Sequence, residues 1–441
     1  MSELGRVLRL DARRAALLLA VPLLAGIGIV TAWRSLVPGV GYWDNSVVAL
    51  INSVRLLGPV AAGLAAWTAV RERGLNYLRD LSPRSPATGA LLDLLLLAGA
   101  AALAYGAVTV AVTVETMLRQ EAGHPYPLGL LAGTASLVLH VVIGYLAGRA
   151  VPRPATVVAV AALTWLWAAL RPPGTSWWSL LPPAALDHVE LFTVLRTSVL
   201  ADQTVWAMGV TAALVLAYVG WVTRRRAVAV PMVLALLVTG NAMTGLQGSG
   251  GSAVVPAPVR LACREWPLTV CVHPALRSAL PALMTATTPL ATRLSGTPGE
   301  FNRVVQRPAT EPATVAGGTA SIHLDDELSP GYEVRAVRQI MRSLADAQAC
   351  ASPRNPGYRA LVDAWLLGRA APPITDTRTA RRFGQWTEEQ RRGWLRTHYA
   401  NYQSCALAAR DFRLSVTPRP ADAPRPSPRP LEPRGADGLP K

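Results

Sequence analysis

The chain has 441 residues, of which 51% are hydrophobic, with a formal net charge of +16 and a mean hydropathy of +0.29. Such a basic balance often indicates nucleic-acid binding, but here the arginines lie beside long apolar segments or in a proline-rich tail, so we exclude nucleic acid as a partner. The only lysine is the last residue, Lys441. A phosphate-binding P-loop needs a lysine before a helix, so the chain does not hydrolyse ATP by that route.

The first fourteen residues place Leu4, Val7 and Leu8 on one helical face and most of the charges elsewhere. This pattern predicts a short amphipathic helix (1–14) on the membrane surface, with a plain charged flank as the alternative. The segment 15–244 is then predicted to be a transmembrane bundle of six to seven spans, since a span needs roughly 20 apolar residues. The apolar stretches are 15–33, 47–70, 88–114, 128–146, 155–170, 204–222 and 227–243.

The arginines between these stretches predict their orientation, because positive residues stay on the cytoplasmic side. With the N-terminus inside, thirteen arginines border the inner face and four the outer face. An odd number of spans places everything after Met243 outside the cell membrane. The inner arginines are Arg6, Arg9, Arg13, Arg14, Arg71, Arg73, Arg79, Arg84, Arg149, Arg153, Arg224, Arg225 and Arg226. The outer ones are Arg34, Arg119, Arg171 and Arg196.

The inner loop after the second span runs RERGLNYLRDLSPRSPATG from Arg71 to Gly89. Near-helical spacing of its apolar residues, ending at a Ser-Pro pair, predicts a short helix along the cytoplasmic surface and then a turn. This charged run with glycine, leucine-bearing turn, Ser-Pro and following span is similar to the ABC-2 type permease family. The resemblance implies that the loop couples to a separate ATPase subunit. The residues that match are Arg71, Glu72, Gly74, Leu78, Leu81, Ser82, Pro83 and Ser85.

The wider layout of residues 1–223 also resembles that family. It has an interfacial helix, the coupling loop after span two, a tight return after span four and a long outer connection, 171–203, between spans five and six. Two aromatic or apolar pieces broken by prolines in this connection predict half-inserted helices at the outer interface. The resemblance implies a homodimer or heterodimer in the membrane. A seventh span and the domain behind it depart from the family's layout.

A glycine-rich linker, 245–255, is predicted to lead into an extracytoplasmic α+β domain, 256–415, and a disordered Pro/Arg-rich tail, 416–441. Alternating and helical patterns predict strands at 268–273, 302–306 and 319–324 and helices at 274–294, 332–349 and 388–407. Thr387 and Gln390 predict a capping box for the last helix.

All four cysteines lie in this external domain, and an even set there predicts two disulfides. Three pairings are possible. We favour Cys263–Cys271 and Cys350–Cys405, because each pair is nearest along the chain. A zinc site is the alternative, but CxxC spacing is absent.

Ionisable residues inside predicted spans are candidates for function. They are Arg55, near the outer end of its span, Asp93, near the inner end of its span, and His140, near the middle of span four. For His140, a satisfied structural histidine is favoured over a bond across helices. We predict no catalytic residues, metal or cofactor, because the chain has no P-loop, no HExxH and no G-x-S-x-G.

The sequence therefore predicts an ABC-2-like permease subunit that couples to a separate ATPase and exports an unknown substrate. One alternative is a membrane-anchored sensor or binding protein with an extracytoplasmic recognition domain. The other is a degenerate membrane-bound metallopeptidase that has lost its zinc-binding histidines.

Overall fold

The computed structural model describes residues 15–36, 42–72, 86–119, 122–351 and 356–413. The chain forms two compact units. The first contains the helical bundle and a small sheet, up to Thr288 together with Asn302–Ile340. The second contains Pro289–Phe301 and the residues from Met341 onward. The predicted amphipathic helix 1–14 and the predicted tail 416–441 lie outside the described residues.

All seven predicted apolar stretches form helices within the described part of the chain. Five helical stretches, in α3, α5, α6, α8 and α9, are long and apolar enough to cross a membrane by length and composition, while the apolar parts of α2 and α7 are shorter. The helices are α2 (Ala15–Ser35), α3 (Trp43–Glu72), α5 (Pro86–Leu118), α6 (Pro127–Ala150), α7 (Pro154–Ala169), α8 (Thr197–Thr223) and α9 (Ala229–Gly248).

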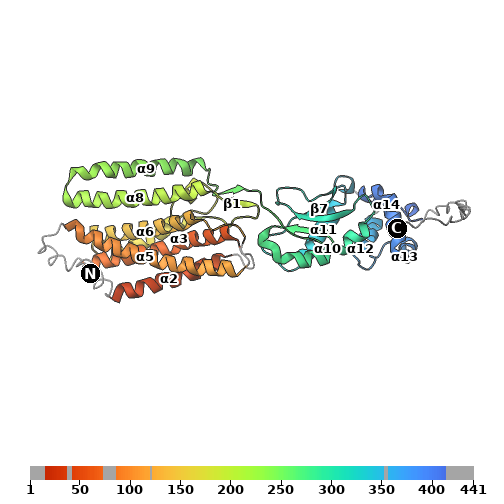
Figure 1. Ribbon diagram of the computed structural model, residues 1–441, viewed down its shortest axis with the longest axis horizontal. Helices are drawn as coiled ribbons and strands as arrows, with labels where there is room; N and C mark the ends of the chain where they lie inside the picture. The colour runs from red at the N-terminus through yellow and green to blue at the C-terminus, as the bar shows by residue number, and fades with distance from the viewer. Residues whose placement is uncertain (1–14, 37–41, 73–85, 120–121, 352–355, 414–441) are drawn as a thin grey trace, which may run out of the picture. The chain divides into compact units, whose positions relative to one another are not determined.

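Successive helices run in opposite directions, so their links gather at two ends of the bundle (Figure 1). We call one the arginine end, because arginines lie there in the last turns of α3 and α6 and in the links after α6 and α8: Arg71, Arg149, Arg153 and Arg224–Arg226. The other is the connection end, where α7 joins α8 through residues 170–196. Proline at the first position starts both α6 and α7, as its fixed φ favours. Arg224, in the left-handed conformation, ends α8.

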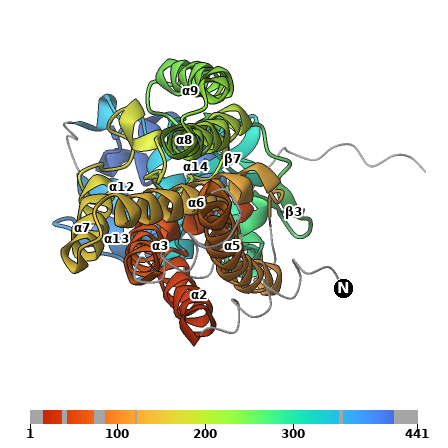
Figure 2. The same ribbon diagram turned by 90° about the vertical axis from the view of Figure 1, so that its left-hand side faces the viewer.

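Among the described helices, α3 and α6 make the most extensive contact, and they lie side by side in both views (Figures 1 and 2). A Cβ added to Gly144 would lie 2.0 Å from the carbonyl oxygen of Ala62, and one added to Gly148 would lie 2.6 Å from that of Ala66. The two backbones are therefore in direct contact. Gly144-xxx-Gly148 is the small-residue spacing that permits such contact between membrane helices.

The connection between α7 and α8 differs from the prediction of two half-inserted helices. It contains a short 3-10 helix, η2 (Trp177–Leu180), and a strand, β1 (Thr193–Leu195). That strand pairs antiparallel with β2 (Val254–Pro256). Thr193–Leu195, just before α8, are extended because β2 supplies partners for their backbone hydrogen bonds. The local sequence around β1 does not reveal these partners.

The predicted linker 245–255 is also corrected by the structure. Helix α9 continues through Gly248, and β2 occupies the end of the segment. Only a short turn separates them, with Gly250 and Gly251 at positive φ. Glycine serves here as a turn former rather than as part of a flexible spacer.

The small sheet has five strands in the order β3-β4-β5-β7-β6. Strands β4 and β5 are parallel and are connected by η4 (Pro274–Ala279) and α10 (Leu280–Leu294), as a parallel pair requires. The predicted strands are confirmed, whereas α11 (Tyr332–Ser343) is shorter than predicted. The strands are β3 (Ala262–Arg264), β4 (Thr269–Val272), β5 (Phe301–Gln306), β6 (Val315–Ala316) and β7 (Gly318–Ile322).

The second unit is helical and has an aromatic core. Phe383 packs edge-on against Trp365 and Trp386, and Trp394 stacks on Phe412 at 4.7 Å. The predicted capping box of Thr387 and Gln390 is confirmed at the start of α14, which ends earlier than predicted. The unit contains η5 (Ala349–Ala351), α12 (Pro356–Leu366), α13 (Thr377–Gln385), α14 (Glu388–Gln403) and η6 (Ala409–Asp411).

Both favoured cysteine pairs form disulfides. Cys263 and Cys271 are direct partners across β3 and β4, so the strand register brings them together. Cys350 in η5 is joined to Cys405, just after α14. No free cysteine remains in the chain. All four cysteines therefore form disulfides, and none is left as a zinc-binding thiolate.

Candidate functional site

The first half of α3 carries a polar stripe that binds the backbone of the α7–α8 connection. The Asn45 amide accepts a hydrogen bond from the Val189 N–H at 2.6 Å and donates to the Val189 carbonyl at 3.2 Å. Asn52, seven residues later on the same helix face, makes the same two bonds with Leu186, at 3.1 and 2.8 Å. Each side-chain amide thus hydrogen-bonds both the N–H and the carbonyl of one residue in an extended segment, as a neighbouring strand does.

Two charged residues of α3 extend this contact at either end. Asp44 accepts a hydrogen bond from the Leu195 N–H at 2.8 Å. Arg55 donates to the carbonyl of Ala168 at 2.7 Å and to that of Arg171 at 3.3 Å. The Arg55 guanidinium therefore lies at the C-terminus of α7, where the helix dipole favours a positive charge.

Arg171 organises the connection itself. It is 6% exposed, and its guanidinium donates to four backbone carbonyls. They belong to Trp167 at 2.9 Å, Trp178 at 3.0 Å, Leu181 at 2.6 Å and Pro183 at 3.0 Å. Burial and the neighbouring charge of Arg55 lower the pKa of Arg171 to about 10, so it stays protonated at neutral pH. Together, Asn45, Asn52, Arg55 and Arg171 form what we call the connection clamp.

We expect Arg171→Ala to lower the free energy of unfolding by about 3 kcal/mol, because it leaves four carbonyls without their donor. Arg171→Lys should restore less than half of the loss, since an ammonium lacks the planar fork of a guanidinium. Chemical unfolding of the full-length protein in detergent measures both changes.

Arg119→Ala is the matched control for this prediction. Arg119 also lies at the connection end, but it forms a partly exposed ion pair with Glu115, four residues earlier in the chain. Such pairs contribute roughly 0.5 kcal/mol. Equal losses for Arg171→Ala and Arg119→Ala would show that the connection clamp does not hold the connection.

Deeper in the bundle, His140 lies against α3 at Gly58. A Cβ added to Gly58 would lie 2.7 Å from the imidazole, so the glycine makes room for the ring. The Nδ1 of His140 is 2.7 Å from the Ser136 carbonyl of its own helix. The Ser136 hydroxyl and that of Tyr105 are buried without a partner among the described residues. These groups place polar atoms in the interior of the bundle.

Asp93 lies closer to the arginine end and accepts a hydrogen bond from the Tyr145 hydroxyl at 2.9 Å. It is 7% exposed, so this bond links α5 to α6 inside the bundle. Asp93 therefore lies apart from the other two, whereas His140 packs against Gly58, one helix turn from Arg55. The structure joins Arg55 to Arg171 but does not gather the three into one cluster.

The proposed coupling residues fall mostly outside the described residues. Arg71 and Glu72 form the last turn of α3, and Arg71 is exposed, with its guanidinium 5.5 Å from the Trp67 ring. Gly74, Leu78, Leu81, Ser82 and Pro83 lie outside the described residues. Arg71 nevertheless places the beginning of the loop at the arginine end.

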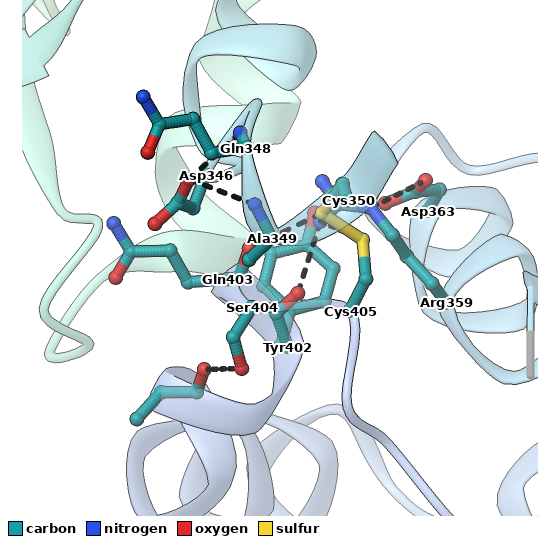
Figure 3. Close-up of a disulfide and its surroundings, with 11 residues drawn as sticks. Asp346, Gln348, Ala349, Cys350, Arg359, Asp363, Tyr402, Gln403, Ser404 and Cys405 are labelled. Carbon is teal, nitrogen blue, oxygen red and sulfur yellow. Dashed lines mark hydrogen bonds and ion pairs between the residues drawn. A yellow bond between two sulfur atoms is a disulfide. The ribbon is translucent and has the colours of Figure 1, made fainter. Parts of the chain in front are cut away.

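In the second unit, the Cys350–Cys405 disulfide lies within a polar network centred on Arg359 (Figure 3). Arg359 donates to the Tyr402 carbonyl at 2.9 Å, is 3.2 Å from the Cys405 sulfur, and pairs with Asp363 at 3.5 Å. Tyr402 donates its hydroxyl to Asp363 at 2.8 Å. Burial and Asp363 raise the pKa of Tyr402 well above its usual value, which keeps this donor protonated.

The same unit contains a pocket of about 290 Å³ with an excess of positive charge. Its charged lining consists of Arg293, Arg369, Arg391 and Glu388. Arg391 donates to two backbone carbonyls of α13 and Arg293 to one of α12. Trp365 donates its indole N–H to Glu388 at 2.9 Å. Arg293 and Arg391 also pair with Glu388, at 4.0 and 3.7 Å.

The described residues contain no cluster of three or more His, Cys, Asp or Glu side chains that could hold a metal ion. Sequence reasoning missed Asn45, Asn52 and the role of Arg171. The signal in the sequence was the pair of asparagines seven residues apart, on one face of an apolar helix. Comparison of the chain with family models, curated proteins and solved structures found no match.

Proposed function

We propose that the chain is the membrane subunit of an ABC-2-type exporter, driven by a separate ATPase that binds the loop 71–85. The observation that carries the proposal is the dual placement of α3. Its first half binds the α7–α8 connection through Asn45, Asn52 and Arg55, and its last turn leads into the loop that resembles the coupling element.

Helix α3 has 30 residues and is about 45 Å long, enough to cross a bilayer. The helix therefore links the ATPase-binding end of the bundle to the connection at the other end. Gly58 and Pro59 lie at the middle of the helix, where the missing proline N–H weakens the helix and permits bending. The contact with Gly144 and Gly148 holds the second half against α6.

The orientation belongs to the proposal as well. The arginine end faces the cytoplasm because positive residues are retained there. The α+β domain is then extracytoplasmic, in the oxidising compartment that favours its two disulfides. This makes the protein a multi-pass component of the cell membrane, with its ATPase-binding loop on the side where ATP is available.

We expect the double substitution Leu78→Asp and Leu81→Asp to abolish co-purification of a P-loop ATPase with the tagged full-length protein. Two carboxylates placed in an apolar docking surface leave buried charges unpaired. Quantitative mass spectrometry of the detergent-solubilised complex, expressed in its native host, measures the expected loss of at least tenfold.

Val151→Asp is the control for this experiment. Val151 is 49% exposed in the α6–α7 link, at the same end of the bundle, and lies outside the matching segment. Its substitution should leave ATPase recovery unchanged. Unchanged recovery from the double variant would contradict the coupling role.

A second candidate function is ligand recognition by the C-terminal unit of a membrane-anchored binding protein. The positively charged pocket of Arg293, Arg369 and Arg391 favours this reading. Such a protein needs no ATPase, so the Leu78 and Leu81 experiment also separates the two candidates.

A further inference from the structure

Helix α9 lies at the edge of the bundle and packs against α8 (Figures 1 and 2). The residues that face α8 are buried and spaced three or four apart: Thr239, Ala242 and Leu246. At this contact a Cβ added to Gly209 of α8 would lie 2.2 Å from the Thr239 hydroxyl. One face of α9 is therefore occupied by α8.

The opposite face has a regular heptad pattern. Its residues recur at alternating intervals of four and three, which is the spacing of a two-helix seam. Val230, Leu234 and Leu237 are 75%, 62% and 66% exposed, and the three that follow are also exposed. We call this set the α9 seam. It consists of Val230, Leu234, Leu237, Asn241, Thr244 and Gly248.

Asn241 distinguishes this seam from a face that merely contacts lipid. It lies seven residues, or about 10 Å, from the end of α9, within the apolar part of the helix. A side-chain amide exposed to hydrocarbon loses its hydrogen bonds to water and gains none in return. An amide both donates and accepts, so a second asparagine at the same depth satisfies it.

We propose that the α9 seam pairs with the α9 seam of a second copy of this chain. Both copies insert in the same direction, so the two helices are parallel and identical residues meet across the two-fold axis. The amides of the two Asn241 residues then bond to each other. Thr244 and Gly248, both small, allow close approach at that end. This pairing does not rest on the proposed transport activity.

Single cysteines test the seam in native membranes. The four natural cysteines are already paired, so an added cysteine reports on its own position. We expect oxidation to give disulfide-linked dimers for Leu237→Cys and Thr244→Cys, at least about fivefold more than for the off-seam variants Leu236→Cys and Val238→Cys. These two controls are also exposed, at 51% and 44%, but lie to either side of the seam.

Substitution of Asn241 tests the amide itself. We expect Asn241→Leu to weaken self-association in detergent by roughly tenfold, the effect of losing interhelical hydrogen bonds. Asn241→Gln keeps an amide and should retain most of the association. Equal cross-linking at all four positions, no cross-linking in the seam, or a fully dimeric Asn241→Leu variant would overturn the proposal, since lipid or another protein would then cover this face.

Discussion

Replacing Gly144 by alanine is expected to lower the free energy of unfolding of the bundle by about 3 kcal/mol, although it adds one methyl group. The new Cβ would lie 2.0 Å from the Ala62 oxygen and 2.7 Å from the Ala62 Cα, both backbone atoms of a packed helix. No side-chain rotation relieves this overlap, so α3 and α6 must move apart. Chemical unfolding of the full-length protein in detergent measures the loss.

Separation of these helices also affects the connection clamp, because Asn45 and Asn52 lie on α3. We therefore expect Gly144→Ala to increase proteolytic cleavage within 170–196. Gly106→Ala on α5 is the control, since a Cβ there would meet nothing within 4 Å. It should be neutral or slightly stabilising, as alanine favours helix over glycine. A Gly144→Ala variant as stable as the Gly106→Ala variant would contradict the backbone contact.

Removal of the Cys350–Cys405 disulfide is the second large expected effect. The bond closes a loop of 55 residues, for which the loss of unfolded-state entropy corresponds to about 4 kcal/mol. The double variant Cys350→Ser and Cys405→Ser should destabilise the second unit by this amount. The chain has 13 tryptophans, and only Trp365, Trp386 and Trp394 lie in the aromatic core of this unit. Limited proteolysis during denaturation, with the cleavage sites between 356 and 413 identified by mass spectrometry, therefore measures the loss.

The other disulfide provides a matched comparison. Cys263 and Cys271 are separated by eight residues and are already held by paired strands, so their removal should cost roughly 2.5 kcal/mol. Equal losses from the two pairs would contradict the loop-length argument. Arg359 still pairs with Asp363 and the Tyr402 carbonyl without the disulfide, which should let the reduced unit retain its fold at low temperature.

Features that depend on local pattern could be predicted from the amino-acid sequence. The lengths of the apolar stretches predicted seven helices, because a helix that crosses lipid must form its backbone hydrogen bonds within one continuous segment. The spacing of Thr387 and Gln390 identified a helix start, since a capping box involves residues only three apart. Proximity along the chain also selected both cysteine pairs, which the structure joins.

Features that depend on contacts with distant backbone became visible only in the folded chain. Asn45, Asn52 and Arg171 bind carbonyls and amides, groups that every residue carries, so no sequence pattern names their partners. The segment before α8 became a strand rather than a helix because β2, about sixty residues later, completes its hydrogen bonds. Long-range pairing of the main chain overrides local propensity wherever a polar backbone must be satisfied away from water.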